Sequence, residues 1–162
     1  MDEANVIQID LPATHRFLNV LGASIAEMLA RIDEPCPAPE IVYQIQLAAH
    51  EICTNIVEHA YAGSDGRIAI TLRVVETPRR FIIELRDRGA HTFDPSRTEM
   101  PVPEELDLHG RGIMLVRASV EQTTYHARDG RCWMVRQDED WCAVEPSVAT
   151  RDQNVWQLVK FL

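Results

Sequence analysis

The sequence predicts a two-layer α/β sandwich, in which a mostly antiparallel mixed sheet carries its helices on one face. Three observations support this class. Short runs with the period of a β-strand alternate along the chain with longer stretches that have the apolar spacing of a helix. Two pairs of predicted strands are joined by turn sequences typical of hairpins, which favour antiparallel pairing. With 162 residues, 46% of them hydrophobic, the chain is long enough to bury one sizeable core.

The first part of the chain predicts one strand and two helices. Residues 5–11 alternate between polar and apolar side chains, as a half-buried strand does. Thr14 can cap a helix that runs to about residue 32. The proline-rich segment 33–39 predicts a loop before a second helix, and Gly63 suits the left-handed turn that ends that helix.

The middle of the chain predicts two hairpins separated by a long loop and a third helix. The loop has little periodicity, which is typical of a lid or a binding loop. The second hairpin has Asp129-Gly130 as its turn. The segments are strands 67–75 and 80–87, loop 90–109, helix 110–121, and strands 123–127 and 132–137.

The last 25 residues have no clear pattern, so we predict a domain over residues 1–137 and a C-terminal extension of unassigned structure over residues 138–162. Four apolar residues of this extension are expected either to cover a sheet edge or to bind a partner: Val155, Leu158, Val159 and Leu162.

Composition narrows the class of protein. The net charge is −9 and no run of Lys or Arg exists, so we expect no nucleic-acid partner. The N-terminus lacks the order of a signal peptide and no apolar run reaches membrane-spanning length, so we expect a cytoplasmic protein with no membrane partner. The four cysteines have no metal-ligand spacing and are too few for a disulfide framework, which predicts reduced thiols.

The second predicted helix carries a line of polar side chains beside its apolar stripe. Glu51 and Asn55 are four residues apart and Glu58 is three further on, so the three project from successive turns. Such a line indicates one wall of a cleft, although Glu and Asn on helices are commonly only solvated. We expect a functional role for Glu51 and Asn55, and a surface position or a supporting role for Glu58.

Two glycine-containing motifs follow. Asp87 ends a predicted strand and Gly89 comes two residues later, so a carboxylate can accept a hydrogen bond from an exocyclic amine where a planar base approaches the backbone. Gly110 and Gly112 open the third helix, whose free amides and positive dipole end make a phosphate site. Arg111, between these glycines, can contact a phosphate or remain exposed.

Together these motifs resemble the GHKL (Bergerat-fold) ATP-binding family, and within it the bacterial anti-sigma-factor serine/threonine kinases. The resemblance covers residues 5–137. One difference is His91, which stands where many relatives have a second glycine. The matching segments are Glu-x-x-x-Asn-x-x-x-His-Ala-Tyr at 51–61, Asp-x-Gly at 87–89, Phe-Asp-Pro at 93–95 and Gly-x-Gly-Ile at 110–113.

The resemblance implies a role for each of these residues. Asn55 would hold a Mg²⁺ ion that bridges the phosphates of ATP, and Glu51 would be the general base. Asp87, with Gly89, would contact adenine, and Gly110 with Gly112 would form the phosphate loop. A hard cation prefers oxygen ligands, and a carboxylate one turn away can reach the γ-phosphate, so the chemistry of these side chains agrees with those roles.

The resemblance also implies a function. The expected protein is an anti-sigma factor that phosphorylates an anti-sigma-factor antagonist and sequesters a sigma factor, in a homodimer built on the N-terminal strand and the first helix. The alternative is a nucleotide-gated binding module with little or no kinase activity. The catalytic half of a histidine kinase fits less well, because no helical hairpin with a phosphoacceptor histidine precedes this domain.

Overall fold

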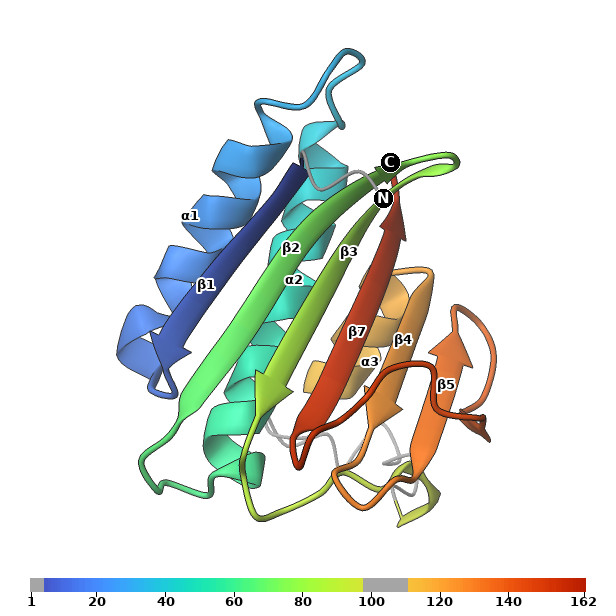
Figure 1. The fold of residues 1–162 in the computed structure, drawn as a ribbon. Coiled ribbons are helices and arrows are strands. Elements are labelled where there is room, and N and C mark those ends of the chain that lie inside the picture. Colours follow the sequence, from blue (N-terminus) through green and yellow to red (C-terminus); the bar gives the residue numbers. More distant parts are fainter. Residues whose placement is uncertain (1–4, 98–110) are drawn as a thin grey trace.

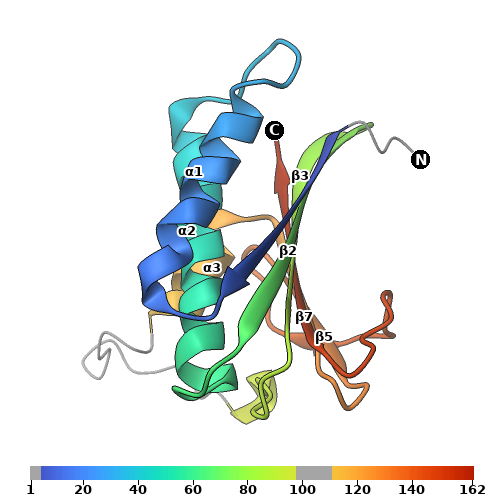
Figure 2. The same cartoon turned by 60° about the vertical axis from the view of Figure 1, so that its left-hand side comes forward.

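The protein folds into two layers, a sheet and a set of helices that cover one of its faces (Figures 1 and 2). The structure is a computed structural model and describes residues 5–97 and 111–162. Within these residues all sheet pairings are antiparallel, so the predicted sandwich is confirmed and its sheet contains no parallel pair in the described residues. No helix in the described ranges is long and apolar enough to cross a bilayer.

In residues 5–97 and 111–162 the sheet has seven strands, in the order β1-β2-β3-β7-β4-β5-β6. The two predicted hairpins are present, as β2 with β3 and β4 with β5. The strands are β1 (Val6–Pro12), β2 (Arg67–Glu76), β3 (Arg79–Asp87), β4 (Gln122–His126), β5 (Cys132–Arg136), β6 (Cys142–Ala143) and β7 (Asn154–Phe161).

The core lies between the sheet and the helices. Alternate residues of β2, namely Ile68, Ile70 and Leu72, are almost completely buried, whereas their neighbours on the other face are more exposed. Ile45 and Ile52 on the apolar stripe of α2 (Pro39–Asn55) are equally buried. The apolar residues that recur with a period of two in the strand therefore pack against those that recur with a period of about 3.6 in the helix.

The N-terminal helix begins later than predicted. A 3₁₀ turn, η2 (His15–Phe17), precedes α1 (Leu18–Leu29), and Thr14 makes no side-chain capping hydrogen bond. The prediction that Thr14 caps the helix is therefore wrong. Thr14 has extended backbone angles, and its N–H and C=O bond to backbone atoms of Pro12 and Phe17.

The second helix ends in a wide turn. After α2 the chain forms a π-helical turn, η3 (Ile56–Ala60), closed by the Tyr61 N–H donating to the Ile56 carbonyl at 3.0 Å. Gly63 then has a φ of 83°, so the predicted left-handed stop is confirmed. A single π turn inside a helical segment is uncommon and often occurs at functional sites.

The third helix, α3 (Gly112–Ser119), is shorter than predicted at both ends. Gly110 and most of the predicted 90–109 loop fall outside the described residues. The part of that loop that is described runs from Ala90 to a 3₁₀ turn, η4 (Pro95–Arg97).

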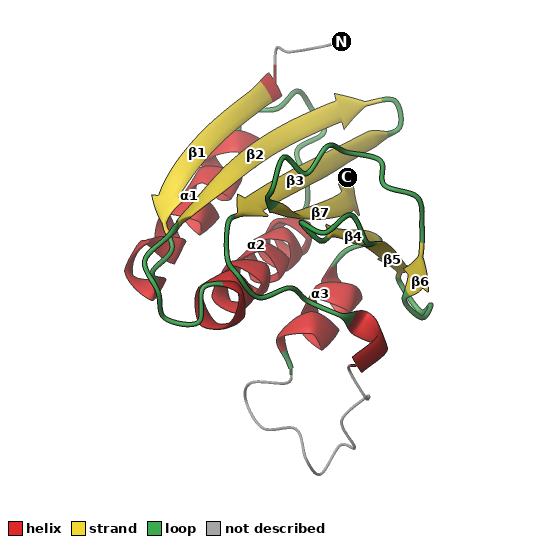
Figure 3. Cartoon of the chain, turned by 60° about the horizontal axis from the view of Figure 1, so that its bottom comes forward, coloured by secondary structure: helices red, strands yellow, loops and turns green. Residues whose placement is uncertain are grey.

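The C-terminal extension belongs to the sheet. β7 lies between β3 and β4 and is paired along both edges, so Val155 and Leu158 are buried at the centre of the molecule. The expectation that these residues cover a sheet edge or bind a partner is wrong, and a boundary at residue 137 separates strands of one sheet. Residues 144–153, which lead into β7, cross the helix-free face (Figure 3), where Ala149 accepts a hydrogen bond from Arg86.

Candidate functional site

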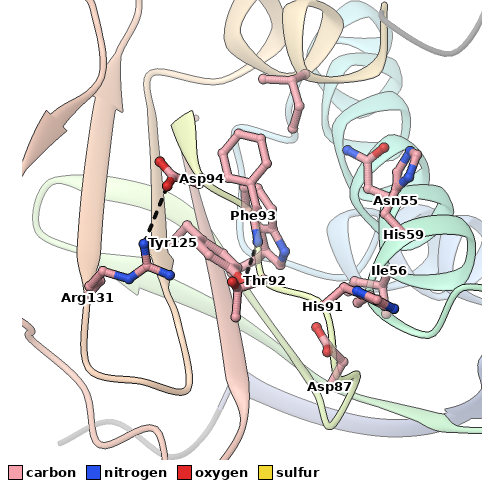
Figure 4. A pocket seen from close by; sticks show the side chains of 13 residues that line it. Asn55, Ile56, His59, Asp87, His91, Thr92, Phe93, Asp94, Tyr125 and Arg131 are labelled. Atoms are coloured by element: carbon pink, nitrogen blue, oxygen red, sulfur yellow. Dashed lines mark hydrogen bonds and ion pairs between the residues drawn. The ribbon is translucent and has the colours of Figure 1, made fainter. Parts of the chain in front are cut away.

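A cavity of about 460 Å³ lies between the end of α2 with its π turn, the segment after β3, and strands β4 and β7 (Figure 4). This volume is within the range of small-molecule sites. Its walls combine apolar and polar side chains: Asn55, Ile56, His59, Ala60, Asp87, His91, Thr92, Phe93, Asp94, Ile113, Tyr125, Arg131 and Trp156. The cavity therefore brings together residues of the first two sequence motifs.

Asp87, the last residue of β3, carries a buried carboxylate with one satisfied and one unsatisfied oxygen. Its Oδ1 accepts hydrogen bonds from the Gly89 N–H at 2.9 Å and from the Asn154 carboxamide at 3.0 Å. Its Oδ2 is buried and has no hydrogen-bond partner among the described residues. A buried acceptor without a partner is costly, so this oxygen marks a position where a ligand donor would be stabilised.

The surroundings of Asp87 also change its acidity. Burial raises its pKa to about 6, and the hydrogen bonds from Asn154 and Gly89 and the positive charge of Arg128 oppose that rise. Desolvation is the larger influence because the side chain is 1% exposed. Such strongly shifted carboxyl groups in a cavity are typical of functional sites.

Gly89 is required by the close approach of two backbone segments. A Cβ atom at this position would lie 2.4 Å from the carbonyl carbon and oxygen of Ala60, which no side chain tolerates. The His91 N–H donates to that same carbonyl at 3.3 Å. The π turn thus carries the Ala60 carbonyl to the segment after β3, and the two segments together form the wall beside Asp87.

Tyr61 also connects the end of the π turn to the segment after β3. Its hydroxyl accepts a hydrogen bond from the Arg88 N–H at 2.9 Å and donates to the Arg67 carbonyl at 2.6 Å. The His-Ala-Tyr sequence at 59–61 therefore has a structural reason, because Ala60 and Tyr61 both hold the chain that follows β3.

Glu51 and Asn55 converge on the first turn of α3. A Cβ atom on Gly112 would lie 2.8 Å from Glu51 Oε2 and 3.6 Å from Asn55 Oδ1, so both side chains lie close to this glycine. Asn55 lines the cavity, whereas Glu51, one turn earlier, lies beside it. Arg111 is exposed at the N-cap of α3. The phosphate loop predicted from Gly110 and Gly112 is described only from Arg111 onward.

The third residue of the predicted polar line is turned away from this site. Glu58 lies in the π turn, and its carboxylate is 3.3 Å from His15 Nε2. The wider turn and the contact with the 3₁₀ turn before α1 account for this position. The expectation of a surface or supporting place for Glu58 agrees with its partial exposure.

Aromatic rings form the far wall of the cavity. Phe93, from the Phe-Asp-Pro segment, packs against Tyr125 and Trp156 with ring centroids 5.6 and 5.1 Å apart. The Phe93 N–H also donates to the Tyr125 hydroxyl at 3.0 Å. Trp141 packs on Phe93 from the other side, at 5.5 Å. These contacts hold the segment after β3 against the sheet and keep the cavity open beside Asp87.

Sequence reasoning missed two contributors from β7, Asn154 and Trp156. Asn154 is fully buried and contacts Asp87 directly, while Trp156 lines the cavity. The β-branched and aromatic residues of this segment, Val155, Trp156, Val159 and Phe161, are signals of a strand. This strand was not predicted, because the residues around it form only short patterned runs and no hairpin turn precedes it.

The fold, an antiparallel sheet with helices on one face, is consistent with an ATPase domain of the histidine kinase type. The chain belongs to the histidine kinase-like ATPase domain family, whose sequence profile matches residues 11–136. This range contains the motifs of α2, β3 and α3 but ends before β7.

The chain is also similar to proteins named serine-protein kinase RsbW. It is 25% identical over 141 residues to the one from Bacillus pumilus (strain SAFR-032), covering 80% of this chain and 83% of that protein. It is 28% identical over 130 residues to the one from Bacillus thuringiensis (strain Al Hakam), covering 75% of this chain and 77% of that protein. The protein of the same name from Bacillus anthracis gives the same values.

Proposed function

We propose that this protein is an anti-sigma factor with ATP-dependent serine/threonine kinase activity, which phosphorylates an anti-sigma-factor antagonist and sequesters a sigma factor. The observation that carries the nucleotide site is Asp87 Oδ2, a buried acceptor without a partner among the described residues, on the wall of a cavity of about 460 Å³. The similarity to serine-protein kinases supports phosphoryl transfer as the reaction.

The residues present fit ATP and Mg²⁺. Asp87 Oδ2 offers an acceptor to the exocyclic amine of adenine, and the backbone of Gly89 packs directly on that of Ala60 in the wall beside it. Asn55 offers a carboxamide oxygen near the first turn of α3, where backbone amides favour anions. Mg²⁺, when bound, would neutralise charge on the phosphate oxygens.

The chain's own contribution to catalysis would be positioning and proton transfer. Asn55 Oδ1 lies near Gly112 in the first turn of α3, so in this proposal the oxygen that would hold the metal ion and the helix amides that would meet the phosphates lie together. Glu51 is the general base in this proposal, because its carboxylate is one turn from Asn55 and contacts the same glycine. Arg111 and Gly110 complete the set of phosphate contacts that we propose.

The proposed homodimer uses the free edge of the sheet. Among the described strands β1 pairs with β2 alone, and α1 lies at the same end of the molecule (Figure 1). Three large apolar side chains in this region are 37–45% exposed: Ile7 on β1, Phe17 in the 3₁₀ turn before α1, and Val20 on α1. Light scattering at high protein concentration tests this part, and a monomer there would refute it.

Calorimetry with ATP and Mg²⁺ tests the nucleotide site. Wild-type protein should bind in a magnesium-dependent manner, and Asn55→Ala should lose that dependence. His50→Ala is the matched control, since His50 is an exposed residue of the same helix outside the cavity. No binding by the wild type would refute the proposal.

Transfer of phosphate separates the kinase from a binding module. Labelled ATP, added to purified protein with a candidate antagonist, should give a labelled serine or threonine on that antagonist. Glu51→Gln should keep ATP affinity and lower the transfer rate by about 100-fold, the usual contribution of a general base. Equal, negligible transfer by wild type and Glu51→Gln would favour the nucleotide-gated binding module.

A further inference from the structure

We propose that Asn154 is a positioning residue that sets which base the cavity accepts. It holds one oxygen of the Asp87 carboxylate, so that the other oxygen faces the ligand as an ionised hydrogen-bond acceptor. The identity of the ligand as a nucleotide rests on the proposed function. The effect of Asn154 on Asp87 is a property of the chain and can be measured without a ligand.

Asn154 uses its whole carboxamide within the protein. It is the first residue of β7, lies opposite Asp87 in the strand register and is fully buried. Its Nδ2 donates to Asp87 Oδ1 at 3.0 Å and to the Gly89 carbonyl at 3.3 Å, and its Oδ1 accepts from the Arg128 N–H at 3.0 Å. A rotated carboxamide would set its oxygen against two acceptors, so these contacts fix its orientation.

Because of this arrangement, a ligand can make one kind of contact with Asp87, a hydrogen bond donated to Oδ2. Oδ1 receives two N–H groups, from Gly89 and Asn154, while Oδ2 has no partner in the described part of the chain. A base that presents an amine there gains a charge-assisted hydrogen bond, whereas a base that presents a carbonyl sets acceptor against acceptor. A 6-amino purine should therefore be preferred over a 6-oxo purine by at least about 100-fold.

The preference requires that Asp87 be ionised, because a protonated carboxyl group can donate to a carbonyl. Asn154 stabilises the ionised form by its hydrogen bond, in opposition to burial. Six further groups with titratable or charged side chains lie around Asp87 or share its cavity. They are Tyr125 from β4, Arg128 and Arg131 from the turn after it, His59 from the π turn, and His91 and Asp94 from the segment after β3. All six side chains are still present in a variant that changes Asn154 alone, in which Arg128 loses its backbone hydrogen bond to Asn154 Oδ1.

The test compares Asn154→Leu with Gln157→Leu. Gln157 lies on the same strand, three residues after Asn154, so its side chain projects from the opposite, helix-free face of the sheet. Its neighbours in the register are Glu84 and Thr124, which do not line the cavity. Titration of ligand-free protein by ¹³C NMR, with the Asp87 signal assigned by its loss in Asp87→Asn, measures the pKa of that carboxyl group directly. We expect it to rise from about 6 to about 7 in Asn154→Leu, the effect of one ordinary hydrogen bond, and to stay at the wild-type value in Gln157→Leu.

Nucleotide competition gives the second measurement. At pH 7, Asn154→Leu should bind MgATP about twofold more weakly than wild type, because the ionised share of Asp87 falls from about nine-tenths to about half. Its preference for MgATP over MgGTP should fall by about tenfold, the change in the ratio of ionised to protonated carboxyl groups. A role in stability alone would lower the unfolding midpoint but leave both the pKa and the base preference unchanged, and that result would overturn the proposal. If Asn154→Leu does not fold, Asn154→Ala is measured in the same way and with the same criteria.

The two proposals fail in different ways. If wild type binds neither nucleotide while the Asp87 pKa still rises in Asn154→Leu, the nucleotide function is refuted and the positioning of Asp87 by Asn154 is supported. If wild type binds MgATP and the pKa does not move, Asn154 is not the positioning residue.

Discussion

Replacing Asp87 by asparagine should make the ligand-free protein more stable while it removes nucleotide binding. The pKa of Asp87 is raised from 3.8 to about 6 by burial, so the folded state holds this proton more tightly than the unfolded state does. A raised pKa in a carboxyl group means that stability is lost as the pH rises from about 4 to about 6, because the folded chain must then ionise a buried group.

The size of this destabilisation follows from the pKa shift. A difference of about two pH units between the folded and unfolded pKa values lowers the free energy of unfolding by roughly 3 kcal/mol at pH 7 and by about half as much at pH 5. The carboxamide of Asp87→Asn keeps an acceptor for the Gly89 and Asn154 donors and carries no charge. The variant should therefore approach this gain at pH 7 and lose it progressively in acid.

Urea unfolding of wild type and Asp87→Asn at pH 4, 5, 7 and 8, without nucleotide, measures this difference. Asp129→Asn is the control, because Asp129 is an exposed carboxylate whose pKa is lowered by its hydrogen bonds with Arg131, so its replacement should give no gain. The reasoning is refuted if Asp87→Asn is less stable than wild type at pH 7, or if its advantage does not shrink between pH 7 and pH 4.

Three further predictions use the same unfolding and binding assays. Gly89→Ala should destabilise the fold by about 3 kcal/mol or more, because the added Cβ would meet the Ala60 carbonyl. In the control Gly22→Ala in α1, the nearest neighbour of the added Cβ is 3.9 Å away, so this change should be neutral or stabilising by up to about 1 kcal/mol. Equal effects of the two substitutions would contradict the contact between Gly89 and Ala60. A chain ended at residue 137 should show no cooperative unfolding by circular dichroism, since it lacks the strand between β3 and β4, and a cooperative transition would show that β7 is dispensable. A thiol reagent should label two exposed cysteines in the native protein and all four after unfolding, and labelling of the buried pair at the rate of the exposed pair would contradict their burial. The exposed pair is Cys36 and Cys142, and the buried pair is Cys53 and Cys132.

Much of the fold could be predicted because its elements are locally encoded. The hairpins β2–β3 and β4–β5 and the helix α2 have patterns that their own residues specify, and they lie close to their predicted ranges. The polar line of α2 was harder, since a π turn after Asn55 rotates the next residues and takes Glu58 to His15. A helical wheel assumes one period throughout and cannot anticipate that change.

The rest could not be predicted because it depends on contacts between distant parts of the sequence. Asn154 meets Asp87 only because β7 enters the sheet beside β3, 67 residues away in the chain. Nothing in the residues around Asn154 distinguishes a buried carboxamide from an exposed turn. Family membership was accessible from the sequence, because the segment that matches the family, residues 11–136, contains the motifs of α2, β3 and α3.

The position of β7 has a consequence for how the protein is made. The ribosome completes β1 to β3 and then β4 to β6 before it reaches residues 154–161, yet these two groups of strands meet only through β7. Each group emerges with an open strand edge that must wait for a segment synthesised later. The cavity wall with Trp156 and the contact of Asn154 with Asp87 form at that last step, so a chain interrupted during synthesis would be unable to bind a ligand there.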